Sequence, residues 1–205
     1  MSQTIERLRT DHQRLRAVLN TISAVSDDMS KDDFDTQSDH LFCLVDYLSG
    51  YPEHLHHPTE DLVFDKMLEL DLTAEQQEKV EWNRAQHKVL SAATSELMDM
   101  VEAPPEEVDI SAFKEQLEHF VSIQRQHMAF EEEEIFPLAL ETISSNNWAT
   151  LDDRFGSASD PLFDEADRRY AALFRFLVPG DEHLNAELAE PLMRYLAATG
   201  GTPGG

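Results

Sequence analysis

The strongest constraint in this sequence is a histidine–glutamate pair that occurs twice at helical spacing. His56 and Glu60 lie four residues apart within Tyr51–Asp61, and His127 and Glu131 repeat that spacing much later in the chain. On an α-helix, residues four apart project from one face, one turn from each other. A neutral imidazole and a carboxylate placed in this way can ligate one metal ion or bridge two. The two pairs therefore predict two helices that each present metal-binding side chains.

The first pair has two possible registers, because His57 and Asp61 also lie four residues apart. Apolar side chains continue both frames along the same helix, so hydrophobicity leaves the choice between them open. The second pair begins an acidic run, in which Glu131 lies on the face of His127 and the next residue, Glu132, points away from it.

The apolar periodicity predicts an all-α chain with no strands. Four amphipathic helices are expected, at about residues 5–22, 35–70, 73–102 and 109–143. Thr73 followed by Gln76 forms a capping box at the start of the third helix. Pro52 and Pro58 interrupt the second helix and predict a kink, or two abutting helices, beside the histidines. Short connections favour an antiparallel up-down four-helix bundle with additional C-terminal helices.

The heights of the histidines in such a bundle can be compared without an alignment. Residues at equal height on consecutive antiparallel helices are equidistant from the turn that joins them. Between His12, the first pair, His87 and the second pair, the midpoints fall at about residues 35, 72 and 108. All three lie close to the expected turns. The candidate ligands therefore converge in one layer, and they are His12, His56, Glu60, His87, His127 and Glu131.

Each of these side chains has a simpler interpretation when it is taken alone. A single histidine on an apolar face is more often a core histidine bonded to a neighbour than a ligand. Four histidines and two glutamates in one apolar layer are costly to bury without a cation, however, which favours metal binding. The remaining histidines are assigned to surface or structural positions, and they are His40, His54, His119 and His183.

Composition narrows the classes of partner. The 205 residues carry a formal net charge of −25, which argues against nucleic acid and anionic membranes as partners. Hydrophobic residues make up 41% of the chain, enough to exclude a disordered protein. Cys43 is the only cysteine, so no intrachain disulfide can form. The sequence has no apolar signal core and no run long enough to span a bilayer, and we expect a cytoplasmic protein.

The ordered set of His12, His56-x-x-x-Glu60, His87 and His127-x-x-x-Glu131 resembles the hemerythrin-like, or HHE cation-binding, family of the bacterial type. This resemblance implies a four-helix bundle that holds two non-haem iron ions, bridged by the two glutamates and an oxo or hydroxo group. It favours the register of His56 and Glu60 over that of His57. Imidazole and carboxylate ligands also suit zinc and manganese.

One departure from the resemblance concerns the third helix. Oxygen-carrying hemerythrins have two histidines four residues apart there, whereas the residues four before and four after His87 are Asn83 and Ser91. His57 could fill one position, and any open position suits dioxygen, peroxide or nitric oxide. The resemblance implies a protein that binds, senses or reduces such species, with peroxide decomposition as one activity. The alternatives are an iron-storage or iron-responsive protein and a reversible oxygen carrier without turnover.

Three regions are expected along the chain. Residues 1–145 form the hemerythrin-like bundle, residues 146–198 form a helical extension that packs on it, and residues 199–205 form a flexible tail. Within the extension, residues 164–177 and 186–196 are predicted to be helices. The oligomeric state is left open.

Overall fold

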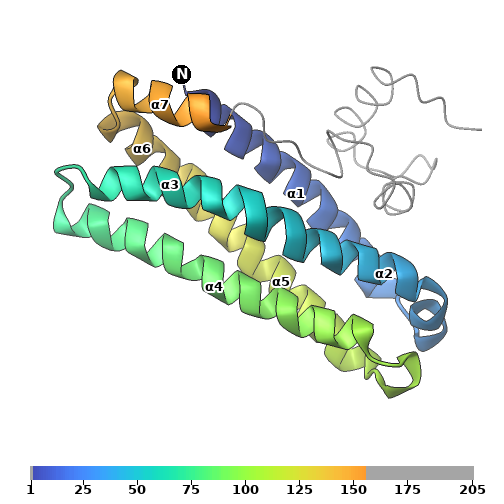
Figure 1. Cartoon of the computed structure of the whole chain (residues 1–205). Helices are drawn as coiled ribbons and strands as arrows, with labels where there is room; N and C mark the ends of the chain where they lie inside the picture. Colours follow the sequence, from blue (N-terminus) through green and yellow to red (C-terminus); the bar gives the residue numbers. More distant parts are fainter. Residues whose placement is uncertain (1, 156–205) are drawn as a thin grey trace, which may run out of the picture.

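The computed structural model describes residues 2–155, which form an all-α structure without strands in that range (Figure 1). The elements are α1 (Gln3–Asp28), α2 (Lys31–Tyr51), η1 (Pro52–His56), α3 (His57–Leu68), α4 (Ala74–Glu102), η2 (Pro105–Glu107), α5 (Ile110–Phe130), η3 (Glu131–Ile135), α6 (Phe136–Thr142) and α7 (Ser145–Phe155). Here η2 is a short 3₁₀-helix, and η1 and η3 are single π-helical turns.

Side chains that cap the helices fix where α4 and α5 begin. The Thr73 hydroxyl accepts from the Gln76 backbone N–H, and the Gln76 side chain accepts from the Thr73 backbone N–H, so the predicted capping box is confirmed. Asp109 accepts from the backbone N–H groups of Ser111 and Ala112 at the start of α5. These caps set the positions of the two turns, and therefore the heights of the residues on the helices that follow.

A π-helical turn joins α2 to α3, and a second one joins α5 to α6. The backbone N–H of His57 donates to the carbonyl of Pro52, and that of Phe136 donates to Glu131, five residues back in each case. A proline follows each turn, at Pro58 and Pro137, and it cannot donate the next backbone bond of an α-helix. The break predicted beside the first histidines is therefore a widened turn within a continuous helical path.

The long helices lie side by side along most of their length (Figure 1). α1 packs on α5, α4 packs on α2, α3 and α5, and α3 also contacts α6 and α7. Both π-turns thus lie inside helices that are packed on their neighbours. None of the described helices is long and apolar enough to cross a membrane.

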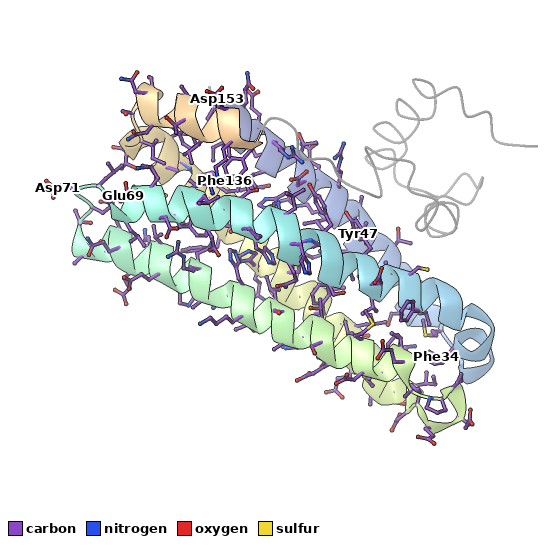
Figure 2. The ribbon with its side chains drawn as sticks, viewed as in Figure 1. Phe34, Tyr47, Glu69, Asp71, Phe136 and Asp153 are labelled. Atoms are coloured by element: carbon purple, nitrogen blue, oxygen red, sulfur yellow. The ribbon has the colours of Figure 1, made fainter. Side chains whose placement is uncertain are left out.

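The hydrophobic core consists of two separate clusters. One contains Leu15 of α1 and Phe34 of α2, and the other contains Leu8 of α1 and Phe136 of α6. Figure 2 shows Phe34 towards one end of the molecule and Phe136 towards the other. His12 lies between Leu8 and Leu15 on the same helix and is itself buried. A buried polar layer therefore separates the two clusters.

α7 is fixed to the start of α1 by one carboxylate. Asp152 Oδ1 accepts from the Ser2 hydroxyl at 3.0 Å and from the backbone N–H and hydroxyl of Thr4 at 2.9 and 2.7 Å. Partial burial raises the pKa of Asp152, but the bonds from Thr4 and Ser2 outweigh it and leave this pKa lowered. The predicted helices at 164–177 and 186–196 and the tail at 199–205 lie outside the described residues.

Candidate metal centre

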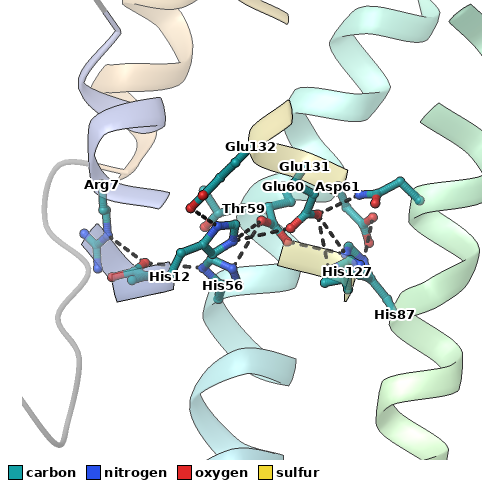
Figure 3. Close-up of polar contacts among 12 residues, drawn as sticks. Arg7, His12, His56, Thr59, Glu60, Asp61, His87, His127, Glu131 and Glu132 are labelled. Atoms are coloured by element: carbon teal, nitrogen blue, oxygen red, sulfur yellow. Dashed lines mark hydrogen bonds and ion pairs between the residues drawn. The ribbon is translucent and has the colours of Figure 1, made fainter. Parts of the chain in front are cut away.

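The buried layer between the two apolar clusters consists of imidazole and carboxylate groups from four helical segments (Figure 3). Its members are His12 on α1, His56, His57 and Glu60 around the first π-turn, His87 on α4, and His127 and Glu131 around the second π-turn. Each of the seven is at most 8% exposed. The structure thus brings together all six side chains predicted from the sequence, and adds His57.

Glu60 directs its two oxygens to two different groups of histidines. Its Oε1 lies 3.2 Å from His56 Nε2 and 3.5 Å from His12 Nε2. Its Oε2 lies 3.4 Å from His87 Nε2. One carboxylate therefore faces both groups at once.

Glu131 repeats this arrangement from the other π-turn. Its Oε2 lies 3.3 Å from His12 Nε2, whereas its Oε1 lies 3.2 Å from His127 Nε2 and 3.9 Å from His87 Nε2. We call His12 and His56 the first half-site, and His57, His87 and His127 the second half-site. Both carboxylates connect the two half-sites.

The inward-facing atoms of this layer fit the ligand set of a metal ion. Among the described residues, the Nε2 atoms of all five histidines, both oxygens of Glu60 and Oε2 of Glu131 are buried without a hydrogen-bond partner. Each such atom costs about 1–3 kcal/mol if it stays unsatisfied. Ligands about 2.1 Å from one ion and at right angles are about 3 Å apart, close to the distances found here. Two sets of side chains are spaced to hold an ion, namely His12, His56 and Glu60, and His57, Glu60, His87 and His127.

His57 reaches the layer because the first π-turn widens the helix. Consecutive residues of an α-helix point about 100° apart, so a regular helix directs only one of His56 and His57 inward. A π-turn accommodates an extra residue, and both histidines are buried. The ring of His57 stacks on that of His87, with centroids 4.3 Å apart at 11°. Asp61, the other member of the second register, stays at the surface with its side chain 42% exposed.

Carboxylates and arginines support the outer side of the first half-site. His12 Nδ1 lies 3.0 Å from Glu132 Oε1, and Arg16 donates to the other oxygen of Glu132 at 2.6 Å. His56 Nδ1 lies 3.4 Å from Asp11 Oδ2. Glu132 was expected to point away from the face of His127, and its carboxylate reaches across to α1, where it contacts His12 from outside the layer. Such carboxylate–imidazole pairs orient a metal-binding ring and raise its basicity.

The histidine rings of the second half-site are held less firmly from outside. His87 Nδ1 lies 3.3 Å from Asp61 Oδ1 and His57 Nδ1 lies 3.7 Å from Glu53 Oε1, but neither contact has the geometry of a hydrogen bond. His127 Nδ1 has no hydrogen-bond partner among the described residues. The two half-sites thus share the same inner carboxylates but differ in what holds their rings from outside.

The pKa values describe an ion-paired layer that holds protons in place of a cation. Burial lowers the pKa of His56, but Glu60 and Asp11 outweigh it and raise this pKa to about 9. Burial acts in the same way on His87, where Asp61, Glu131 and Glu60 raise the pKa to about 11.

The pKa values of the other side chains in the layer are set by burial and by the charges of their neighbours. The pKa of His12 is also raised, because its contacts with Glu131, Glu132 and Glu60 outweigh burial. Burial lowers the pKa values of His57 and His127. Burial raises the pKa of Glu60 and of Glu131, but the facing histidines outweigh it and leave both pKa values lowered. The metal-free layer therefore carries ionised glutamates beside protonated histidines.

Asn83 holds one of the bridging carboxylates. It is fully buried on α4, and its Nδ2 donates to Glu131 Oε1 at 2.6 Å. The position four residues before His87 thus carries a group that orients Glu131. Arg84, the next residue, binds Asp61 and Asp65 at the surface.

The histidines assigned to other roles lie elsewhere or outside the described parts. His54 is exposed, with Nδ1 2.9 Å from the Gly50 carbonyl oxygen, and His119 is exposed on α5. The side chain of His40 and the whole of His183 are not among the described groups. The neighbouring acidic residue Glu134 pairs with Lys79 at 2.8 Å.

Comparison with known proteins identifies the family. The family model of the hemerythrin HHE cation binding domain matches residues 3–139, which include all seven side chains of the layer. Searches of curated proteins and of solved structures gave no match. With two thirds of its length matched by this domain, the chain belongs to the hemerythrin HHE cation-binding family.

Proposed function

We propose that this protein holds two iron ions, one in each half-site, in an antiparallel four-helix bundle. The observation that carries the proposal is the orientation of Glu60 and Glu131, each of which presents one oxygen to each half-site. Bridging carboxylates of this kind are what a pair of adjacent ions requires. Zinc and manganese also suit these donors, and metal analysis decides among them.

The donor count of each half-site indicates where an external ligand would bind. Five imidazoles and four carboxylate oxygens supply nine of the about twelve positions of two octahedral ions. The second half-site has three histidines and the first has two. An oxo or hydroxo bridge would complete the second half-site and leave one position at the first. His57 thus offers the imidazole that is missing from α4.

The protein's own residues would position and isolate the ions. Iron supplies redox and Lewis-acid chemistry when it is bound. Asp11 and Glu132 fix the rings of His56 and His12, and Asn83 fixes Glu131. The two apolar clusters cover the layer on two opposite sides.

This arrangement supports a protein that binds, senses or reduces dioxygen, peroxide or nitric oxide. The polar groups flanking His87 on α4 contact other protein groups: Asn83 is bound to Glu131, and Ser91 contacts Glu53. An iron store or iron-responsive protein, and an oxygen carrier without turnover, are the alternatives. We place the protein in the cytoplasm, and its charge of −25 disfavours nucleic acid as a partner.

The test is metal analysis of the purified full-length chain, combined with optical spectra taken without oxygen, in air and with peroxide. We expect two iron ions per chain and a spectrum that changes with oxidant. Consumption of peroxide over many cycles would identify an enzyme. A spectrum that returns fully to that of the oxygen-free protein when oxygen is removed would identify a carrier. Iron content that follows supply without any spectral response would favour storage. A chain that takes up no metal would overturn the proposal.

A further inference from the structure

A surface pocket between α3 and α4 leads to the second half-site. Its volume is about 450 Å³, and its lining includes His57, His87, Glu53, Asp61 and Lys88. A hexahydrated cation occupies about 180 Å³, taking about 30 Å³ for each water. The pocket is therefore large enough to admit a hydrated divalent ion as far as the stacked rings of His57 and His87.

The exposure of the histidines differs between the two half-sites. His87 is 8% exposed and His57 is 3% exposed, whereas His12 and His56 are fully buried. Both rings of the second half-site that line the pocket also have an inward Nε2 without a hydrogen-bond partner among the described residues. An ion in the pocket thus lies beside two rings whose ligand nitrogens are buried just behind the pocket wall.

The charged side chains outside the two half-sites also differ, and the difference favours the approach of a cation to the second half-site. Arg16 covers the outer side of His12 through Glu132, and Arg7 lies 3.9 Å from Asp11 outside His56. These guanidinium groups oppose the approach of a cation. In the pocket, the carboxylates of Glu53 and Asp61 face the rings, with Lys88 as the cation lining the pocket and Arg84 bound to Asp61.

We propose that this pocket is the port through which divalent metal ions enter and leave the centre. The proposal rests on the metal-binding function proposed above and adds the route to it. An ion first reaches His87 and His57, and the two bridging glutamates then connect it to the first half-site. The backbone beside the port contains the π-turn η1 and Pro58, where the regular α-helical hydrogen bonding is interrupted.

The test measures how fast cobalt(II) enters the metal-free full-length chain and how fast a chelator removes it. Ala92→Trp fills the pocket from the exposed face of α4. We expect it to slow uptake and release by the same factor, about tenfold, because a blocked route changes both rates and leaves the equilibrium affinity unchanged. Ala85→Trp is the matched control, since Ala85 is exposed on the same helix and does not line the pocket.

A second variant tests the charge of the route without adding bulk. Lys88→Glu removes the ammonium group from the pocket, and we expect uptake to be several-fold faster at low salt and less so at high salt. Lys66→Glu makes the same change in net charge on α3, outside the pocket, and we expect it to leave the rate nearly unchanged.

The outcomes separate the port from the metal function. A wild-type chain that binds no cobalt overturns the proposed metal function. A chain that binds cobalt at rates unaffected by Ala92→Trp and Lys88→Glu overturns the port alone. Equal slowing by Ala92→Trp and Ala85→Trp also overturns it, whatever the charge variants show. Slower uptake and release in Ala92→Trp than in Ala85→Trp supports it, as does faster uptake in Lys88→Glu than in Lys66→Glu when the two tryptophan variants do not slow exchange equally.

Discussion

The two half-sites use the same bridging glutamates but are built in different ways. His12 and His56 are fully buried, and each Nδ1 is hydrogen-bonded to a carboxylate that has an arginine close by. In the second half-site, His57 and His87 line a surface pocket, and their Nδ1 atoms lie near Glu53 and Asp61 without forming a hydrogen bond. The first half-site is thus held firmly and fully buried, whereas the second has one histidine more and borders a surface pocket.

This difference suggests a division of roles. Rings whose orientation is fixed from outside keep their geometry when an ion is exchanged or a ligand binds. Rings that line a surface pocket can receive an ion from solvent. We therefore expect the first half-site to set the geometry of the centre and the second to govern metal exchange.

The largest effect is expected from Glu60→Ala, because Glu60 faces both half-sites. Metal content should fall from two ions to fewer than one per chain. If free metal is about 1,000-fold above Kd, losing its binding removes about 4 kcal/mol of stability, roughly 8–16 °C in Tm for a chain of this size. Elemental analysis measures the metal content, and thermal unfolding in excess metal measures the Tm. Glu133→Ala is the control, since Glu133 is exposed, and it should keep two ions.

His56 and His57 are neighbours in sequence but belong to different half-sites, so replacing each one should affect a different ion. His56→Ala should remove the ion of the first half-site, and His57→Ala should weaken the ion of the second, so that each leaves about one tightly bound ion per chain. Titration of cobalt(II) into the metal-free variants checks this. His54→Ala should keep both ions because His54 is exposed. A His57→Ala variant with two ions of unchanged affinity would show that His57 is only a packing residue.

Much of this layer follows from residue spacing. The Thr73 cap and the turn near Asp109 fix where α4 and α5 begin, and from these turns the spacing along each helix places His87 and His127 at one height. The burial of His12 could be expected as well, because it lies within an apolar stripe. Local capping and helical periodicity are enough for these conclusions, since both depend on residues a few positions apart.

The position of His57 depends on a feature that periodicity does not describe. A regular α-helix forces a choice between His56 and His57, and only the π-turn lets both face inward. Pro58 was the available signal, since it removes a backbone donor, but it predicts a break without giving its form. The contact between Glu132 and His12 was missed for a different reason, because it joins residues that only tertiary packing brings together.

A smaller effect is expected from the carboxylates outside the rings. Glu132→Gln should lower metal affinity at the first half-site by about 10–100-fold, because the His12 ring loses a charged partner. Asp61→Asn should have a weaker effect at the second half-site, since Asp61 is 42% exposed, against 29% for Glu132, and His87 Nδ1 makes no hydrogen bond to it. Competition with a chelator of known affinity measures both, and Glu133→Gln is the control. Equal losses from Glu132→Gln and Asp61→Asn would contradict the difference in support between the half-sites.

The last prediction is a pH dependence that has opposite signs with and without metal. In the metal-free chain, His56 and His87 have pKa values of about 9 and about 11, above the value of about 6.5 expected when unfolded. Groups whose pKa is raised by folding stabilise the protein fully below the unfolded value and lose this contribution as pH rises through the folded one. The Tm of the metal-free chain should therefore fall between pH 7 and pH 10.

Glu60 and Glu131 do not cancel this decline, because their lowered pKa values affect stability only in acid. With metal bound, the sign reverses over the same range, since ions compete with protons for the imidazoles and bind more tightly as pH rises. Thermal unfolding of both forms from pH 7 to pH 10 compares them. The metal-free variant His56→Ala/His87→Ala lacks two of the three histidines whose pKa is raised and keeps His12, so its Tm should fall less. A wild-type metal-free chain whose Tm is flat or rises over this range would show that the layer does not hold protons in place of the ions.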